Sequence, residues 1–480
     1  MRGSKLGEMK GMVKKVNTAS VINEAPKEST SSLKSKISFS LYGLGNNAVT
    51  VMQGSYFYFF YETELGLRSG WISLSMTLFG IIMIFGNLLI GYIINRFRRG
   101  SKYGWGAPFL FGGMIVFIVS YILMFTDSFG LSQPMLFAKL LIVSTLYHVA
   151  ISFMNMTMSS MFVDIFRGDR DRRACQLLKV LIGSVGVLIS VVLPPLIIKT
   201  GQVGTYTEAA ILMALIGLLA ILATFPSLRE SPEKLERDKR LKEFYRPYSI
   251  FESIRFIVKQ KDLMFYGFAS IGRAVGDNIV PASIVYIIIY VLKSDMALNS
   301  IVGTVFFLAT IAFTPLFTWL GNKIGDNYKI TVLSVSGLAL STLSLFFVTN
   351  ITSLFVLLIV YSAAQAFYDA NSSNFQSDVY EQIIARTGRR DEPLYSAALF
   401  TIVGAVRIFE ALIFFVVHTA FGFVAGSAEQ SSTAILGIRL QISVFPAIFV
   451  IASVLIIVWK LRITHEKAEQ NRMKIRELKL

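Results

Sequence analysis

The sequence predicts an all-α membrane protein with twelve transmembrane helices arranged as two six-helix bundles. Hydrophobic residues make up 54% of the 480 residues and charged residues only 16%, whereas soluble chains carry about 25% charged residues. Apolar segments long enough to cross a bilayer, which takes about 20 helical residues, recur along the whole chain. A polar stretch at 227–262 divides these segments into two groups of six.

Each apolar segment is expected to be helical, because backbone polar groups in hydrocarbon need partners within the protein. In chain order, the expected helices are 38–62, 71–95, 107–126, 134–164, 176–199, 208–226, 263–292, 298–322, 330–349, 351–380, 393–424 and 436–461.

Two stretches far apart in the chain share one pattern. The first, at 87–106 (NLLIGYIINRFRRGSKYGWG), ends an apolar run with several basic residues and then turns at glycines. The second, at 314–333 (TPLFTWLGNKIGDNYKITVL), repeats the pattern in weaker form. A tight basic loop between apolar segments is typical of the cytoplasmic side of a membrane. The repetition predicts a duplicated bundle.

The formal net charge of +16 is explained by where the basic residues fall. Lysines and arginines crowd both terminal segments and the even-numbered loops, which predicts that these face the cytoplasm. We therefore expect a multi-pass protein of the plasma membrane and no binding of nucleic acid. The expected divisions are a cytoplasmic, disordered tail at 1–37, bundles at 38–226 and 263–462, a cytoplasmic linker at 227–262 and a cytoplasmic tail at 463–480.

The fourth expected helix runs into a charged cytoplasmic stretch, SSMFVDIFRGDRDRRACQLLK. We interpret its charges, together with a basic pair in the tenth loop, as a cytoplasmic gate that holds one conformation rather than as a catalytic group. The predicted gate residues are Asp164, Arg170, Arg172, Arg173, Arg389 and Arg390.

The second half places five charged residues well inside expected helices, away from their ends: Arg273, Asp277, Asp369, Arg407 and Glu410. A lone charge at the membrane centre costs about 2.5–3.5 kcal/mol even on the mildest scale, so these side chains should face the protein interior and pair with one another. The spacing of four and three residues puts the first two and the last two each on one helical face. Two interpretations stand: closed ion pairs that pin helices together, or carboxylates that change protonation and couple an ion to a shape change.

The sequence argues against an enzyme. It holds three histidines, and we expect His418 and His465 to lack acid–base or metal-ligating partners. Hydrolase, metalloprotease and nucleotide-binding motifs of the GxSxG, HExxH and Walker types do not occur. We expect no cofactor and no bound metal.

The motifs resemble the glycoside–pentoside–hexuronide:cation symporters, relatives of melibiose permease in the major facilitator superfamily, over residues 38–475. The opening helix, YGLGNN to YFYFFYETELGL, is similar to that family's first helix. The passage MFVDIFRGDRDRRACQLLK resembles its helix 4–5 connection. The closing stretches SDVYEQIIARTGRRDEPLYSAALF and AEQSSTAILGIRLQISVFPAIF are the most specific part.

The resemblance implies the major facilitator fold, with two bundles rocking about a central site in alternating access. By position it places sugar contacts on Asn47, Asn155 and Lys179, to which we add Asp369 as a mid-span residue. Where the family has cation-binding aspartates on helix 2, this chain has Met83 and Asn87, which weakens the case for sodium.

We therefore expect a monomeric secondary transporter of a small polar solute, a sugar or glycoside, embedded in lipid. The ion-coupling residues are expected to be the five intramembrane charges, with a proton favoured over another monovalent cation. Two alternatives remain open: a lysolipid or amphiphile carrier of the same fold, and a sensor that binds solute without moving it.

Overall fold

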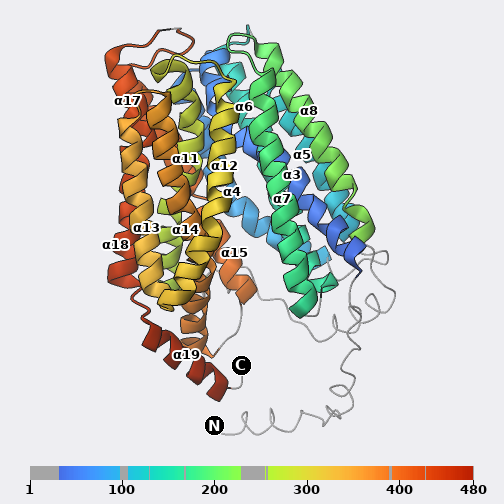
Figure 1. Ribbon diagram of the computed structural model, residues 1–480. Helices are drawn as coiled ribbons and strands as arrows, with labels where there is room; N and C mark the ends of the chain where they lie inside the picture. Colours follow the sequence, from blue (N-terminus) through green and yellow to red (C-terminus); the bar gives the residue numbers. More distant parts are fainter. Residues whose placement is uncertain are drawn as a thin grey trace, which may run out of the picture.

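The computed structural model describes residues 32–97, 106–128, 130–166, 169–228, 255, 258–388, 392–427 and 429–478. All regular structure in these residues is helical, and the long helices run side by side along one direction (Figure 1). Most of the expected cytoplasmic linker at 227–262 falls outside the described residues.

The first half consists of long helices joined by short connections. Its elements are α3 (Leu33–Phe59), η1 (Phe60–Glu64), α4 (Ser69–Phe97), α5 (Gly106–Met124), α6 (Gln133–Ile165), α7 (Asp169–Ile197), α8 (Val203–Leu222) and η2 (Phe225–Leu228).

The second half is built in the same way and ends in an additional terminal helix. Its elements are α11 (Lys261–Tyr286), η3 (Ile287–Val291), α12 (Leu298–Ile324), α13 (Asn327–Ser344), η4 (Leu345–Phe347), α14 (Ile351–Thr387), α15 (Glu392–Val403), α16 (Val406–Ala420), α17 (Ser432–Ile442), α18 (Val444–Lys460) and α19 (His465–Glu477).

Eleven segments among the described residues are long and apolar enough to cross a membrane. The opening helix α3 is not among them, because residues such as Asn46, Asn47 and Gln53 lower its hydropathy. The eleventh and twelfth expected helices are each broken in two: α15 and α16 meet at Gly404, and α17 and α18 meet at Ser443.

The two halves repeat one packing pattern, which supports the predicted duplication. The opening helices, α3 and α11, both end in a five-residue π-helix, η1 and η3. In the first half α3 packs on α7 and α8, while α4 and α5 pack on α6. In the second half α11 packs on α15, α16 and α18, while α12 and α13 pack on α14. Corresponding helices therefore have corresponding neighbours.

We call the end of the bundle that carries η1, η3 and the start of α14 the upper end, and the opposite end, with α19, the lower end (Figure 1). Between the halves, α4 packs against α16, α7 against α12, and α3 against α11. The helices α4 and α12 hold corresponding places in the two halves, and so do α7 and α16. The contacts of α4 with α16 and of α12 with α7 are therefore equivalent, as a two-fold relation requires.

The terminal helix α19 packs against α14 at the lower end. Arg472 of α19 donates to Asp378 at 2.7 Å and to Glu381 at 2.9 Å. The Asp378 side chain is only 1% exposed, so the contact balances a buried carboxylate. The expected terminal tail at 463–480 thus contains an ordered helix docked on the second half.

Candidate functional site

A cavity of about 280 Å³ lies between the two halves. Its walls come from α3 and α7 of the first half and from α11, α12 and α14 of the second. The polar lining residues are Ser55, Tyr56, Ser190, Asp277, Asn299, Tyr361 and Gln365, and the rest are apolar: Val51, Val187, Val191, Val280, Pro281, Ile284, Val302, Gly303, Phe306, Phe307 and Leu358. A few polar groups on apolar walls are typical of sites for small organic molecules.

Contacts between the halves lie beside the cavity, on the side of the upper end. The Asn299 side chain donates to the Tyr56 hydroxyl at 2.6 Å, and the Ser300 hydroxyl donates to the Val192 carbonyl at 2.9 Å. A Cβ atom built on Gly303 would lie 2.1 Å from Val191 Cγ1, so only glycine allows α12 to approach α7 this closely. The first half therefore touches the second directly where α3 and α7 reach the upper end.

An ion cluster joins α11 to α14 beside this cavity. Arg273 forms an ion pair with Asp277 on its own helix and a second with Asp369 at 2.7 Å. The Gln365 amide donates to Asp277 at 3.1 Å and to Asp369 at 3.3 Å. The Arg273 guanidinium also lies 4.6 Å from the centre of the Tyr368 ring, a favourable cation–π distance.

The charges of this cluster do not balance. One guanidinium faces two carboxylates, so the fully ionised group carries one excess negative charge. Asp277 and Gln365 line the cavity, and Asp369 is one hydrogen bond away from Gln365. A proton or a monovalent cation would balance this excess charge.

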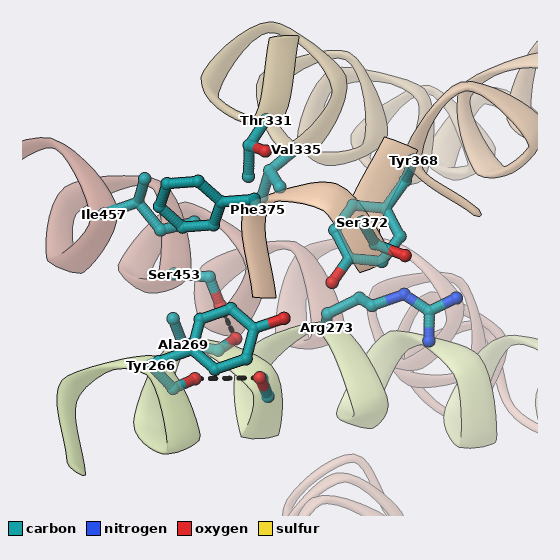
Figure 2. A pocket seen from close by; sticks show the side chains of 11 residues that line it. Tyr266, Ala269, Arg273, Thr331, Val335, Tyr368, Ser372, Phe375, Ser453 and Ile457 are labelled. Atoms are coloured by element: carbon teal, nitrogen blue, oxygen red, sulfur yellow. Dashed lines mark hydrogen bonds between the residues drawn. The ribbon is translucent and has the colours of Figure 1, made fainter. Parts of the chain in front are cut away.

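A second, much smaller hollow lies inside the second half, among α11, α13, α14 and α18 (Figure 2). Its volume of about 10 Å³ is at most enough for one water molecule. Tyr266, Tyr368 and Phe375 form part of its wall, and the Ser453 hydroxyl donates to the Ala269 carbonyl at 2.7 Å. Arg273, the cation of the ion cluster, also lines this hollow. The hollow is too small for a solute.

The other predicted pair, Arg407 and Glu410 on α16, is also formed, at 2.8 Å. The Glu410 side chain is 2% exposed. Phe414 lies one helical turn after Glu410 on α16, and Tyr58 of α3 stacks on it at 4.0 Å between ring centroids. The five intramembrane charges thus form two separate groups, each paired within the described part of the protein.

The residues that the resemblance assigned to sugar contacts do not line the described cavity. The Asn47 amide donates to the Gly183 carbonyl of α7 at 3.0 Å, and Asn155 accepts from the Tyr42 hydroxyl at 2.7 Å. Lys179 is half-buried on α7. Of the four predicted substrate residues, Asp369 alone belongs to the cluster beside the cavity. The sugar-contact role of these residues stays a prediction.

The predicted cytoplasmic gate cannot be described by its contacts. Arg389 and Arg390 lie outside the described residues, and so do the side chains of Asp164, Arg170, Arg172 and Arg173. Close to them, Lys36 at the start of α3 pairs with Asp171 at the start of α7, at 2.7 Å. This pair joins two helices of the same half.

The expectation that His418 lacks a partner is wrong. Its Nδ1 atom lies 2.7 Å from Glu62 Oε1, although the two residues are 356 positions apart. The same carboxylate accepts from the Tyr286 hydroxyl at 2.7 Å and from the Ser69 hydroxyl at 2.5 Å. Sequence patterns within single helices give no signal for this contact. His465 lies 3.8 Å from Glu469 on the surface of α19.

Comparison with known proteins decides the family. The family model described as MFS/sugar transport protein matches residues 38–465. The chain belongs to this family. No curated protein sequence matches it closely enough to count as a relative.

Solved transporters share the fold of this MFS/sugar transport family member. The crystal structure of D-xylose-proton symporter covers 89% of this chain and 96% of its own, with a TM-score of 0.57 and 14% identity. The crystal structure of the nucleoside transporter NupG, solved as a point mutant, covers 88% and 99%, with a TM-score of 0.58 and 14% identity. The inward open xylose transporter XylE from E. coli covers 92% and 98%, with a TM-score of 0.57 and 14% identity. At this identity the likeness establishes the fold.

Proposed function

We propose that this protein is a secondary active transporter that moves a sugar or glycoside together with a proton, by alternating access. The observation that carries the proposal is the unbalanced cluster of Arg273, Asp277 and Asp369 beside a cavity between the halves. In this proposal α3 also crosses the membrane, which brings the number of spans to twelve. Both termini then lie in the cytoplasm of a plasma-membrane protein.

The cluster supports coupling because two carboxylates share the single positive charge of Arg273. When a proton neutralises Asp277, the guanidinium is free to favour Asp369, and the cavity wall loses a negative charge. When the proton leaves, Arg273 returns to Asp277. Such a carboxylate with a movable cationic partner links protonation to local shape and so to solute binding. The paired Arg407 and Glu410 on α16 are the second group proposed to take part.

A proton suits the chain better than sodium. At the helix-2 positions where the family binds cations, Met83 is buried and Asn87 offers only a neutral oxygen. Sodium would lose most of the electrostatic attraction that carboxylates provide. The D-xylose-proton symporter of the same fold is described as proton-coupled, which is consistent with this choice.

Sugar recognition would use the polar groups of the cavity. Ser55, Ser190, Asn299 and Gln365 supply donors and acceptors for hydroxyls. Aromatic and aliphatic walls can cover the apolar faces of a sugar ring. Asn47, Asn155 and Lys179 remain the proposed contacts in the first half, reached when the solute moves along α3 and α7.

A second candidate function is favoured by one observation. Eleven of the cavity's eighteen lining residues are apolar, among them Phe306 and Phe307, and this lining would also suit an acyl chain. An amphiphile such as a lysolipid would then be the cargo. Binding of a lysolipid that sugars do not displace would favour this candidate.

The test is uptake by proteoliposomes of labelled disaccharides, pentosides and hexuronides. Each compound is offered with an imposed pH gradient, a sodium gradient or neither. We expect accumulation of at least one sugar under the pH gradient alone. Failure of every sugar to accumulate would reject the proposal.

The variants Asp277→Asn, Asp369→Asn and Glu410→Gln, alone and combined, test which carboxylates couple proton movement to sugar uptake. We expect the combined variant to lose pH-driven accumulation. Asp295→Asn, which alters an exposed loop acid, is the matched control and should retain it. Unchanged pH-driven uptake by the combined variant would rule out these carboxylates as the coupling groups.

A further inference from the structure

The central cavity holds two buried polar atoms that lack a partner. Gln365 of α14 is 8% exposed and Ser190 of α7 is 1% exposed, and both residues line the cavity. Gln365 Oε1 and Ser190 Oγ have no hydrogen-bond partner among the described residues. Because native proteins pair most of their buried polar groups, these two atoms indicate where a ligand or a water molecule would bind.

The orientation of the Gln365 amide is fixed by its neighbours. Its Nε2 atom donates to Asp277 at 3.1 Å and to Asp369 at 3.3 Å. Ionised carboxylates only accept hydrogen bonds, so the amide cannot be turned round. Both amide hydrogens are therefore used, and the atom left without a partner is an acceptor.

We call Asp277 and Gln365 together the acceptor pole of the cavity. Besides Gln365 Oε1, the pole presents the Asp277 carboxylate, whose side chain is 26% exposed. Arg273 pairs with both carboxylates through its terminal nitrogens, and it is not among the described residues that line the cavity. A group bound at the pole must therefore donate hydrogen bonds. A positive charge on that group would also balance the excess negative charge of the ion cluster.

The rest of the cavity suits the ring of a monosaccharide. Its walls span 277–284 on α11 and 358–365 on α14, which is about 10 Å along the helix axes at 1.5 Å per residue. Its volume of about 280 Å³ is close to the lower limit for small-molecule sites, about 300 Å³. The unpartnered Ser190 hydroxyl can bond a sugar hydroxyl, and Phe306 and Phe307 can cover the C–H groups of a ring.

We propose that the cavity binds an amino sugar, with the ammonium group at the acceptor pole and the ring against the apolar walls. An ammonium group only donates, and its three hydrogens can reach Gln365 Oε1 and the Asp277 carboxylate together. A hydroxyl offers one hydrogen and no charge. The proton that balances the cluster then travels on the amino group of the solute. The inference rests on the proposed function in taking the solute to be a sugar.

Three sugars that differ at one ring carbon test the proposal. D-glucosamine, D-glucose and N-acetyl-D-glucosamine carry an amino, a hydroxyl and an acetamido group there. D-galactosamine, D-galactose and N-acetyl-D-galactosamine repeat the comparison on a second ring. At about pH 6.5 the amino group is charged, because an amine of the α-amino type loses its proton near pH 8.

The experiment measures the melting temperature of the protein in detergent against sugar concentration. It gives each dissociation constant, because a ligand that binds only the folded protein stabilises it. We expect an amino sugar to bind about tenfold more tightly than its hydroxyl and acetamido counterparts, because hydrogen bonds to charged groups are stronger than neutral ones by roughly this factor. Binding is measured without any gradient, so the result does not depend on transport.

Three variants separate direct contact from net charge. Asp277→Asn and Asp369→Asn each remove one negative charge from the same cluster, but only Asp277 lines the cavity. We expect Asp277→Asn to lose the preference for the amino sugar and Asp369→Asn to retain part of it. Gln365→Leu removes the acceptor, leaves the three charges in place and should weaken binding of the amino sugar more than that of glucose. Asp295→Asn, at an exposed loop acid, is the control and should bind every sugar like the wild type.

Wild-type protein that binds the hydroxyl or acetamido sugar as tightly as the amino sugar would overturn the proposal, whatever the variants do, and would leave sugar–proton transport standing. Wild-type protein that neither amino sugar stabilises would overturn it as well, and so would an unchanged preference in Asp277→Asn. Preferential binding of an amino sugar by a protein that accumulates no sugar under a pH gradient would support this site and reject the proposed function.

Discussion

Removing Arg273 tests the central ion cluster most sharply. In Arg273→Gln, Asp277 and Asp369 lose their shared cation and keep only the Gln365 amide, at 3.1 and 3.3 Å. Removing one partner of a fully buried ion pair costs about 3–5 kcal/mol, whereas an exposed pair is worth about 0–1 kcal/mol. The two aspartate side chains are 26% and 46% exposed. We therefore expect an intermediate loss of about 2 kcal/mol.

A loss of this size is measurable as heat stability in detergent. For a half of roughly 200 residues, about 2 kcal/mol corresponds to a melting temperature lower by roughly 4–8 °C. The assay is the fraction of monodisperse protein that survives a heating series. The triple variant Arg273→Gln, Asp277→Asn, Asp369→Asn has no charge left to balance and should recover most of the loss, because neutral replacement of a whole buried ion group is often tolerated.

The comparison between single and triple variants separates charge from packing. An Arg273→Gln protein as stable as wild type would mean that the guanidinium does not balance these carboxylates. A triple variant no more stable than the single one would mean that the loss comes from packing of the arginine side chain, for example on Tyr368.

Two further predictions concern packing and the terminal helix. Gly272→Ala places a Cβ 2.2 Å from a backbone oxygen of α18 and should lower heat stability. Gly276→Ala lies one turn further along α11, where the nearest atom to the new Cβ is 3.7 Å away, and should be neutral. Equal stability of the two variants would contradict the close approach of α11 to α18. Arg472→Gln leaves the buried Asp378 carboxylate without its cation, so α19 should undock and be cleaved by trypsin faster than in the exposed-site control Arg476→Gln. Equal cleavage rates would show that Arg472 does not hold α19.

Hydropathy predicted the helices well, because the cost of exposed backbone in lipid leaves few alternatives. It could not predict the breaks at Gly404 and Ser443, where short-range hydrogen bonds replace the helical pattern within apolar sequence. The polar opening helix α3 shows the reverse case. It was expected as one of the twelve apolar segments, but its polar residues leave it outside the eleven segments that are long and apolar enough to cross a membrane.

Sequence reasoning found the charge pairs within a helix but only part of the clusters between helices. The spacing of Arg273 and Asp277 is local, and both residues are too costly in the membrane to remain unpaired. The partner Asp369 could be suspected on the same ground. Glu62 was hidden because it lies at the end of the first segment, where an acid is ordinary, and its contact with His418 depends on how the two halves meet.

Solute and proton should move together, and simultaneous recording of both fluxes tests this coupling. Proteoliposomes carrying a pH-sensitive dye in the lumen, with equal pH inside and outside, receive the panel sugar that showed the highest uptake. We predict that downhill sugar entry acidifies the lumen, and that the combined Asp277→Asn, Asp369→Asn and Glu410→Gln variant abolishes the acidification. Sugar entry by the wild-type protein with no change in lumenal pH would contradict it.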